Sequence, residues 1–154
     1  MIRSVNRKAL NQAIHSHDVH LKTFGGARIE DMRYYVEPTL SSKPDILILH
    51  CGPNNLRNDD AENLANKIIV PAVEVKKRVA NVAVSGIIFR ADLEIEHNRK
   101  RVNYLVEVGL KDYDIDFISQ DNIKDGHLDK SGLHLNFYGT NVLSGNFANF
   151  GSST

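Results

Sequence analysis

The stretch "DILILHCGPNNL", residues 45–56, joins an uninterrupted apolar run to an abrupt break made of glycine, proline and two asparagines. A continuous apolar run of this length is typical of a parallel strand that is covered on both faces. The break lies where such a strand would leave its sheet. Because ligands bind open parallel sheets at the carboxyl ends of the strands, Gly52 and Asn54 are candidates for contact with a ligand.

The overall composition indicates an ordinary globular domain. The 154 residues are 42% hydrophobic and 25% charged, and 19 basic side chains balance 19 acidic ones. This length suits a single domain, expected over residues 1–150 with a frayed tail at 151–154. The balanced charge provides no overall field to attract nucleic acid, and no apolar run approaches the ~20 residues that span a bilayer. The single cysteine and the polar N-terminus favour a cytoplasmic protein.

Hydrophobic spacing predicts helices that alternate with strands. Helices are expected over the first residues to Ile14, over 27–37, from a cap at Asp60 to Val79 with a kink at Pro71, over 93–111 and over 138–148. Strands are expected over 18–24, 45–50, 82–88 and 115–119. This alternation predicts an α/β fold, a flavodoxin-like three-layer αβα architecture with a parallel sheet. Since the chain opens on a helix, the first strand of that sheet is expected to be missing from these residues.

Three short blocks resemble the SGNH hydrolases, also called GDSL-type esterases and lipases, which are named for a serine, a glycine, an asparagine and a histidine on four separate blocks. "FGGA" (24–27) resembles the glycine block, and "SGLHLN" (131–136) resembles the histidine block. "GPNN" (52–55) resembles the Gly-x-Asn-Asp block, with asparagine in place of the last aspartate. The order and spacing of the blocks fit over nearly the whole chain. "PTLSSKPDILILHCGPNNL" and "SGLHLNFYGTNVLSGNF" are most similar to the esterase-like domains of LINE-type retrotransposon proteins.

The resemblance implies hydrolysis of a small carboxylic ester through an acyl-serine, without a cofactor or a metal. It assigns the oxyanion hole to the backbone N–H of Gly26 and the side-chain amide of Asn54, and the catalytic base to His134. Without the resemblance, "FGGA" and "GPNN" are ordinary turn sequences. A histidine between two leucines also often has a structural role, and His127 is a rival for the base.

Two features depart from the family pattern. The Gly-Asp-Ser block that carries the nucleophile is absent from these residues, and in the most similar branch it would run directly into "MIRSV", so the nucleophile is expected upstream of Met1. Ser131 stands three residues before His134, where the family has the aspartate that orients the imidazole. Asp129 is the nearest substitute acid, with Asp125 behind it.

Other nucleophiles and a metal site are less well supported by the sequence. Ser4 would lie about one helical turn, ~5 Å, beyond the missing serine, within a helix and away from a sharp turn. Cys51 suggests a thiol nucleophile paired with His134, although a lone cysteine is usually a small buried hydrophobe. Three histidines near the N-terminus lack the spacing of a metal site: His15, His17 and His20.

Three classes of function remain open from the sequence. The first is an SGNH-type esterase domain that is inactive as these 154 residues because its nucleophile lies upstream. The second is a non-catalytic binding module of a retroelement-derived protein, with an RNA or protein partner, and the third is a decayed fragment.

The basic stretches 76–78 and 97–101 are accompanied by glutamates, which favours solvated helix faces over a nucleic-acid surface. The sequence indicates no particular oligomeric state.

Overall fold

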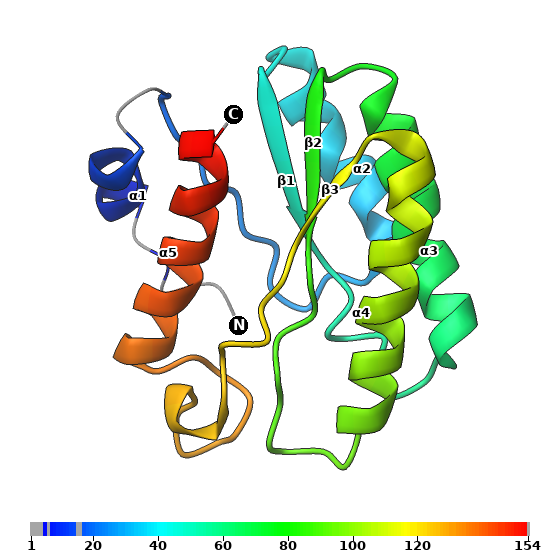
Figure 1. The fold of residues 1–154 in the computed structure, drawn as a ribbon, viewed down its shortest axis with the longest axis vertical. Helices are drawn as coiled ribbons and strands as arrows, with labels where there is room; N and C mark the ends of the chain where they lie inside the picture. The colour runs from blue at the N-terminus through cyan, green and yellow to red at the C-terminus, as the bar shows by residue number, and fades with distance from the viewer. Residues whose placement is uncertain (1–4, 6, 15–16, 154) are drawn as a thin grey trace. The chain divides into compact units, whose positions relative to one another are not determined.

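The chain forms two compact units in a computed structural model that describes residues 5, 7–14 and 17–153. Unit 1 comprises residues 1–25, 88–94 and 118–154, and unit 2 comprises residues 26–87 and 95–117. Figure 1 shows the helices and strands of both units. The predicted oxyanion residues lie in unit 2, whereas the predicted base lies in unit 1.

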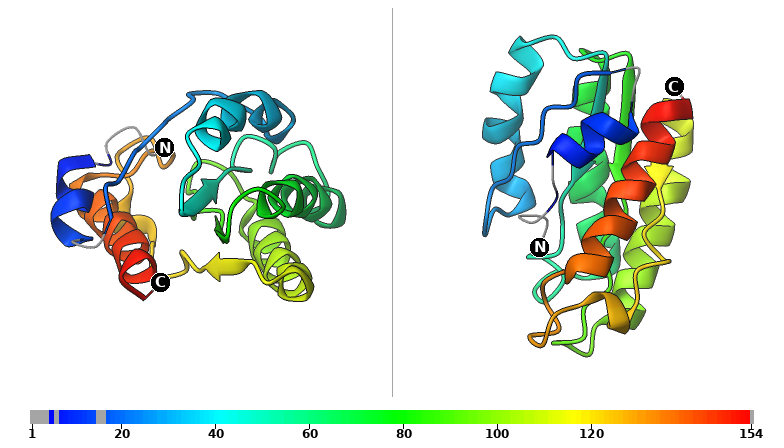
Figure 2. Two further views of the ribbon diagram at one scale, coloured as in Figure 1. Left: turned by 90° about the horizontal axis from the view of Figure 1, so that it is seen from above. Right: turned by 90° about the vertical axis from the view of Figure 1, so that its left-hand side faces the viewer.

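Unit 2 contains parallel strands with helices packed against one face, as Figure 2 shows. β1 and β2 are parallel and pair in register from Ile46 opposite Asn81 to His50 opposite Ser85, and the strand order is β1-β2-β3. The predicted α/β fold with a parallel sheet is therefore confirmed. In chain order the elements are α2 (Ile29–Ser41), β1 (Ile46–His50), α3 (Ala61–Lys76), β2 (Asn81–Ser85), α4 (Glu96–Leu110), the 3-10 helix η1 (Lys111–Tyr113) and β3 (Asp116–Ile118), whose last residue belongs to unit 1.

Helix α3 follows the pattern that its sequence predicts. The Asp60 carboxylate accepts a hydrogen bond from Asn63 N–H at 2.8 Å, which caps the first turn. The helix continues through Pro71 to Lys76. One stripe of its surface is buried, at the spacing of an amphipathic helix: Ala61, Leu64, Ala65, Ile68, Ala72 and Val75.

Buried polar side chains of α4 hold the chain where it leaves β2. Asn103 accepts a hydrogen bond from Ile87 N–H at 2.8 Å through Oδ1, and its Nδ2 donates to Ile87 O at 3.0 Å. Arg99 Nη1 donates to the same carbonyl at 2.8 Å, and Glu96 pairs with the Arg99 guanidinium at 2.7 Å. Asn103 is 7% exposed and Arg99 is 2% exposed. These bonds satisfy a backbone segment that lies outside any strand.

Unit 1 contains α1 (Arg7–Ala13), the 3-10 helix η2 (Asp125–His127) and α5 (Phe137–Ser153). Helices α1 and α5 pack together, and Gly151 is buried where a Cβ would lie 3.0 Å from Ile14 Cδ1. Helix α5 therefore extends past residue 148, its predicted end, and includes residues 151–153, which we expected to fray.

Residues 18–24 form no strand, which corrects the expectation from their alternating pattern. Side chains of α1 bind this segment instead: Asn11 Oδ1 accepts a hydrogen bond from Val19 N–H at 2.6 Å, and Arg7 Nε donates to Val19 O at 2.7 Å. Backbone groups that are satisfied in this way need no neighbouring strand. The other predicted elements are present with shifted ends, and Ser4 lies outside the described residues.

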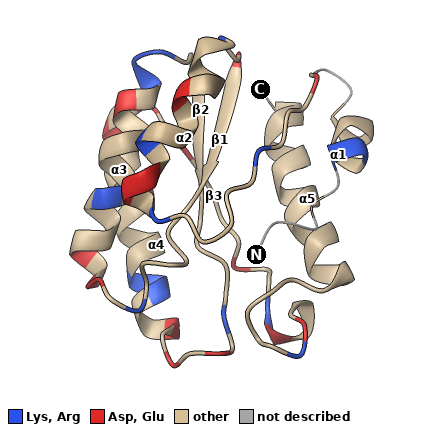
Figure 3. Cartoon of the chain, turned by 180° about the vertical axis from the view of Figure 1, so that it is seen from behind, with Lys and Arg blue, Asp and Glu red and all other residues tan. Residues whose placement is uncertain are grey.

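Charged side chains are distributed unevenly over the helices. Figure 3 shows acidic and basic residues on the helices of unit 2, and the sequence of α5 contains no charged residue at all. Within the part of the chain that the structure describes, no helix has the length and hydropathy needed to cross a membrane.

Replacing Asn103 with Leu should lower the free energy of unfolding by about 2–3 kcal/mol, because Ile87 N–H would be buried without an acceptor. The measurement is urea denaturation followed by circular dichroism. Tyr104→Leu at the neighbouring position, which is 58% exposed, is the matched control and should change stability by less than about 0.5 kcal/mol. An Asn103→Leu variant as stable as the parent would show that the buried amide contributes nothing.

Candidate active-site loops

The loop after β1 requires a glycine for structural reasons. Gly52 has φ +106°, and a Cβ at this position would lie 2.8 Å from Ile87 Cδ1 and 3.3 Å from Ile68 Cδ1. The carbonyl of Gly52 accepts a hydrogen bond from Asn55 N–H at 2.9 Å, which closes a turn. Both the positive φ and the close contact exclude a larger residue. The "GPNN" block is therefore a turn, as its composition predicts, and packing alone accounts for its glycine.

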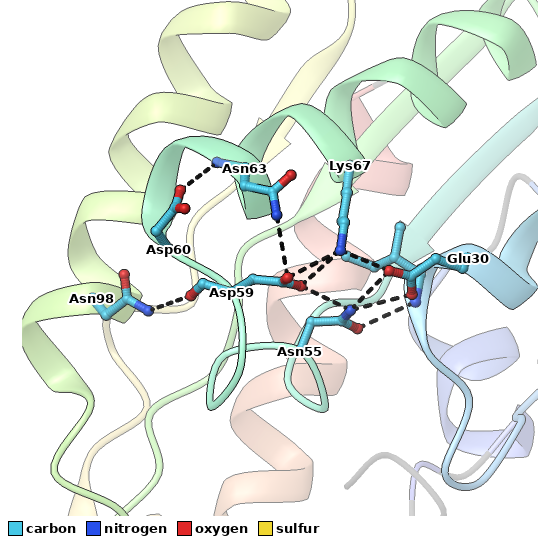
Figure 4. A network of polar contacts seen from close by, with 8 residues as sticks. Glu30, Asn55, Asp59, Asp60, Asn63, Lys67 and Asn98 are labelled. Carbon is cyan, nitrogen blue, oxygen red and sulfur yellow. Dashed lines mark hydrogen bonds and ion pairs between the residues drawn. The ribbon is translucent and has the colours of Figure 1, made fainter.

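Asn55 connects this loop to the start of α2. Its side chain is buried, its Oδ1 accepts a hydrogen bond from Ile29 N–H at 3.3 Å, and its Nδ2 donates to Glu30 Oε2 at 3.2 Å and to Asp59 Oδ2 at 3.1 Å (Figure 4). An aspartate here would place a third carboxylate beside Glu30 and Asp59 and would lack the donating amide. The contacts of this position therefore suit the neutral amide of asparagine.

Lys67 of α3 completes the network around Asn55. Its Nζ lies 2.8 Å from Glu30 Oε1 and 3.0 Å from Asp59 Oδ1. The hydrogen bond from Lys67 is the largest cause that lowers the pKa of Glu30 to about 2, and the amide of Asn55 lowers it further. Asn98 of α4 donates to Asp59 O at 3.2 Å (Figure 4). The loop is thus bound to three helices of unit 2.

The two predicted oxyanion donors lie on neighbouring segments of unit 2. Asn54 Nδ2 donates to Ala27 O at 2.8 Å, and Ala27 directly follows Gly26. Gly26 has φ +78°, and a Cβ there would meet no atom within 4 Å, so the space beside it is open. An amide nitrogen carries two N–H groups, so the bond to Ala27 leaves the second for a ligand. Asn54 and Gly26 are both exposed.

The predicted base lies on a closed loop of unit 1. Leu128 and Leu135 form an antiparallel bridge, and within it Asp129 N–H donates to His134 O at 2.8 Å. Gly132, with φ +68°, turns the loop, and its carbonyl accepts a hydrogen bond from Ala91 N–H at 2.8 Å. The structure therefore places Asp129 and His134 opposite each other, and both are exposed.

Ser131 holds the carboxylate of the predicted acid. Asp129 Oδ1 accepts hydrogen bonds from Ser131 N–H at 2.9 Å and from Ser131 Oγ. The bond from the Ser131 hydroxyl is the largest cause that lowers the pKa of Asp129 below its usual value, and the charge of a protonated His134 acts in the same direction. Both residues are described by the structure, and no hydrogen bond or ion pair joins the Asp129 carboxylate to the His134 ring. The two hydrogen bonds from Ser131 thus hold the Asp129 carboxylate, two residues earlier in the chain, beside position 131.

The rival histidine has a structural role in the same unit. His127 Nδ1 accepts a hydrogen bond from Lys124 N–H at 2.9 Å, and His127 O accepts one from Asn136 N–H at 3.0 Å. Asn136 Oδ1 in turn accepts from Gly139 N–H at 3.0 Å and caps α5. The bond from Lys124 N–H thus uses one nitrogen of the His127 ring to shape η2, and the choice of His134 as the base stays a prediction.

A Ser–His pair that sequence reasoning missed lies at the ends of β1 and β2. His50 Nδ1 lies 2.8 Å from Ser85 Oγ, and the two residues are opposite each other in the parallel register. Burial lowers the pKa of His50 to about 4, and Ser85 is only 1% exposed. His50 is therefore neutral at pH 7 and the Ser85 hydroxyl is buried, which favours a structural role for the pair. The sequence signal that could have revealed this pair is a polar residue at the end of each apolar strand, His50 in β1 and Ser85 in β2.

The environment of Cys51 opposes the thiol-nucleophile hypothesis. Burial raises the pKa of this thiol to about 12, so the reactive thiolate is disfavoured. For the metal hypothesis, the described residues contain no group of three or more His, Cys, Asp or Glu side chains that could hold an ion, and His15 lies outside them.

Comparison with solved structures identifies the fold. The chain matches an acetyl xylan esterase, AlAXEase, with a TM-score of 0.77 at 15% identity, over 93% of this chain and 88% of that one. It matches an acetylxylan esterase from Geobacillus stearothermophilus with a TM-score of 0.72 at 15% identity, over 93% and 77% of the two chains. It matches a carbohydrate esterase family 3 structure from Talaromyces cellulolyticus with a TM-score of 0.72 at 15% identity, over 94% and 87%.

These likenesses establish that the chain has the α/β fold of SGNH-type esterases. Catalytic mutants of the Geobacillus enzyme replace a serine, a histidine and an aspartate three positions before that histidine. Neither the protein-family models nor the curated protein sequences give a match.

Changing Asn55 to Asp should lower the free energy of unfolding by about 2–4 kcal/mol, because it removes donors from two carboxylates and adds a third negative charge. Thermal and urea denaturation at pH 7 measure this loss. Asn58→Asp, on the exposed side of the same loop, is the matched control and should be close to neutral. Equal destabilisation by the two variants would contradict the role of the Asn55 amide.

The native Cys51 thiol should react with iodoacetamide at pH 8.5 at least ~100-fold more slowly than the same thiol in the urea-unfolded chain, because its raised pKa suppresses the thiolate. Mass spectrometry of timed samples gives the two rates. Comparable native and unfolded rates would restore Cys51 as a candidate nucleophile.

Proposed function

We propose that this chain supplies the oxyanion hole and the catalytic base of an SGNH-type carboxylic ester hydrolase. The observation that carries the proposal is the 2.8 Å bond from Asn54 Nδ2 to Ala27 O, which sets the predicted amide donor beside Gly26. The shared fold of acetyl xylan esterases supports it. By analogy with those proteins, the proposed substrate is a small ester such as an acetyl ester.

The proposed reaction proceeds through an acyl-serine. The serine of a Gly-Asp-Ser segment preceding Met1 attacks the ester carbonyl while His134 accepts its proton, and His134 then donates this proton to the leaving alcohol. The Gly26 N–H and the Asn54 amide stabilise the oxyanion that forms on the carbonyl oxygen. His134 next takes a proton from water, which attacks the acyl-serine; as the bond to the serine oxygen breaks, His134 returns this proton to that oxygen and the carboxylic acid leaves.

Asp129 is the proposed positioning residue for His134. Its carboxylate is exposed, is held by Ser131 and has a lowered pKa, so it is negatively charged at neutral pH. A negative charge near the imidazole stabilises the protonated histidine that forms during acyl transfer. Ser131 would therefore act as the neutral link through which a nearby carboxylate replaces the family aspartate.

A non-catalytic binding module of a retroelement-derived protein is the second candidate. A decayed fragment is the third candidate. The coding sequence upstream of Met1 separates these candidates from the first, since an in-frame Gly-Asp-Ser supports the esterase and a stop codon supports the others.

The 154-residue chain should hydrolyse p-nitrophenyl acetate only at a trace rate, and the chain extended by an upstream Gly-Asp-Ser segment should show enzymatic turnover. In the extended chain, Asn54→Ala should lower kcat by ~10²–10³ because one oxyanion donor is lost. His134→Ala should lower it by at least as much, because the serine loses its base.

Asn58→Ala and His97→Ala are the matched controls for this assay, since both side chains are exposed and neither has a proposed role. Turnover that is insensitive to Asn54→Ala and His134→Ala would refute the assignments. An acyl group trapped on Ser4 or Cys51 of the 154-residue chain, located by mass spectrometry, would identify a different nucleophile.

A further inference from the structure

A groove with a volume of about 740 Å³ lies between α2 and α3 of unit 2. Its floor includes Leu49 and Cys51, which project from the same face of the chain because they are two residues apart at the end of β1. Val36 of α2 and Ile68 and Val75 of α3 form apolar walls. The volume is within the ~300–1,000 Å³ of typical small-molecule sites, which also have mainly apolar linings.

Two ion pairs cross the groove from α2. Glu30 binds Lys67 of α3 at 2.8 Å, and Glu37 binds Arg78, just beyond α3, through two bonds of 2.7 and 2.9 Å. The seven residues from Glu30 to Glu37 correspond to ~10 Å along the helix. Since a helix with its side chains is itself ~10–12 Å wide, the span between the pairs suits the apolar part of a small molecule and not a docked helix.

The charged side chains that line the groove are paired, with one exception. Glu30, Glu37, Glu74, Lys67 and Arg78 all form ion pairs within unit 2. Arg33 instead donates to the Tyr34 hydroxyl at 2.7 Å, and its guanidinium carbon lies 4.6 Å from the centre of that ring. Among the described residues, no carboxylate forms an ion pair with Arg33. The groove therefore combines an apolar interior with one cation that has no anionic partner.

We propose that the α2–α3 groove binds a small amphipathic monoanion, an unbranched medium-chain carboxylate. Its aliphatic chain would lie over Leu49 and Cys51 between the two ion pairs, and its carboxylate would bind the Arg33 guanidinium. The chain removes apolar surface from water, and the guanidinium selects a planar anion over a neutral head group. This binding does not depend on esterase activity.

Titration of the full 154-residue chain with decanoate, followed by amide chemical shifts and by calorimetry, tests the proposal. Saturable binding with shifts in α2 and α3 is the expected result. Val70→Glu introduces a charge at an apolar lining position that is 62% exposed, and it should weaken decanoate binding at least tenfold. Val108→Glu on α4, 46% exposed and outside the lining, is the matched control and should leave binding unchanged.

Arg33→Gln tests the head group. It should weaken decanoate binding at least fivefold and leave the weaker binding of decanol unaltered, whereas Arg57→Gln, also exposed, should change neither. Circular dichroism establishes that each variant is folded. Absence of saturable binding, or binding that survives Val70→Glu, overturns the groove as the site, and equal affinity for decanoate and decanol overturns the monoanion. These outcomes concern ligand binding in the α2–α3 groove and do not depend on ester hydrolysis. The groove proposal and the esterase proposal can therefore be refuted independently of each other.

Discussion

The buried amide of Asn55 is the contact on which both candidate sites of unit 2 depend. It binds Ile29 N–H, Glu30 and Asp59, and thereby joins the loop after β1 to the first turn of α2. Asn54 is its neighbour in the chain, so the amide that binds Ala27 O is positioned by the same turn. Glu30 is also one end of the ion pair with Lys67 that closes the α2–α3 groove.

The electrostatics of this network follow from one cation shared by two acids. Lys67 and Asn55 together supply donors to Glu30 and Asp59, and the folded protein holds the pKa of Glu30 at about 2. Because this value is below that of an unfolded glutamate, ionised Glu30 favours the folded state at neutral pH. That contribution is lost as the pH falls from about 4.5 towards 2. The loop is thus most stable at a pH where Lys67, Glu30 and Asp59 are all charged.

The hydrophobic pattern of the sequence predicted the helices and strands whose periodicity is strong. It failed where contacts with other segments determine the structure. The strand β1 was predictable because its apolar run is continuous, and the helix α3 because its buried residues recur at helical spacing. Residues 18–24 have strand-like alternation, but Asn11 and Arg7 bind Val19 instead of a neighbouring strand. The contact between His50 and Ser85 depends on sheet register, which the sequence does not display. The Asn54 and Gly26 assignments came from motif resemblance, and their catalytic roles stay predictions.

Asn55 and Ser131, on two different loops, have the same kind of local contact. Both side chains are neutral at positions where the SGNH motifs that the sequence resembles have aspartate, and each residue donates hydrogen bonds to a nearby carboxylate. Asn55 faces Glu30 and Asp59, whereas Ser131 faces Asp129. At both places donors and carboxylates are matched, so each of these acids has a hydrogen-bond donor. The two neutral residues thus organise their loops by donating to acids, without adding a negative charge of their own.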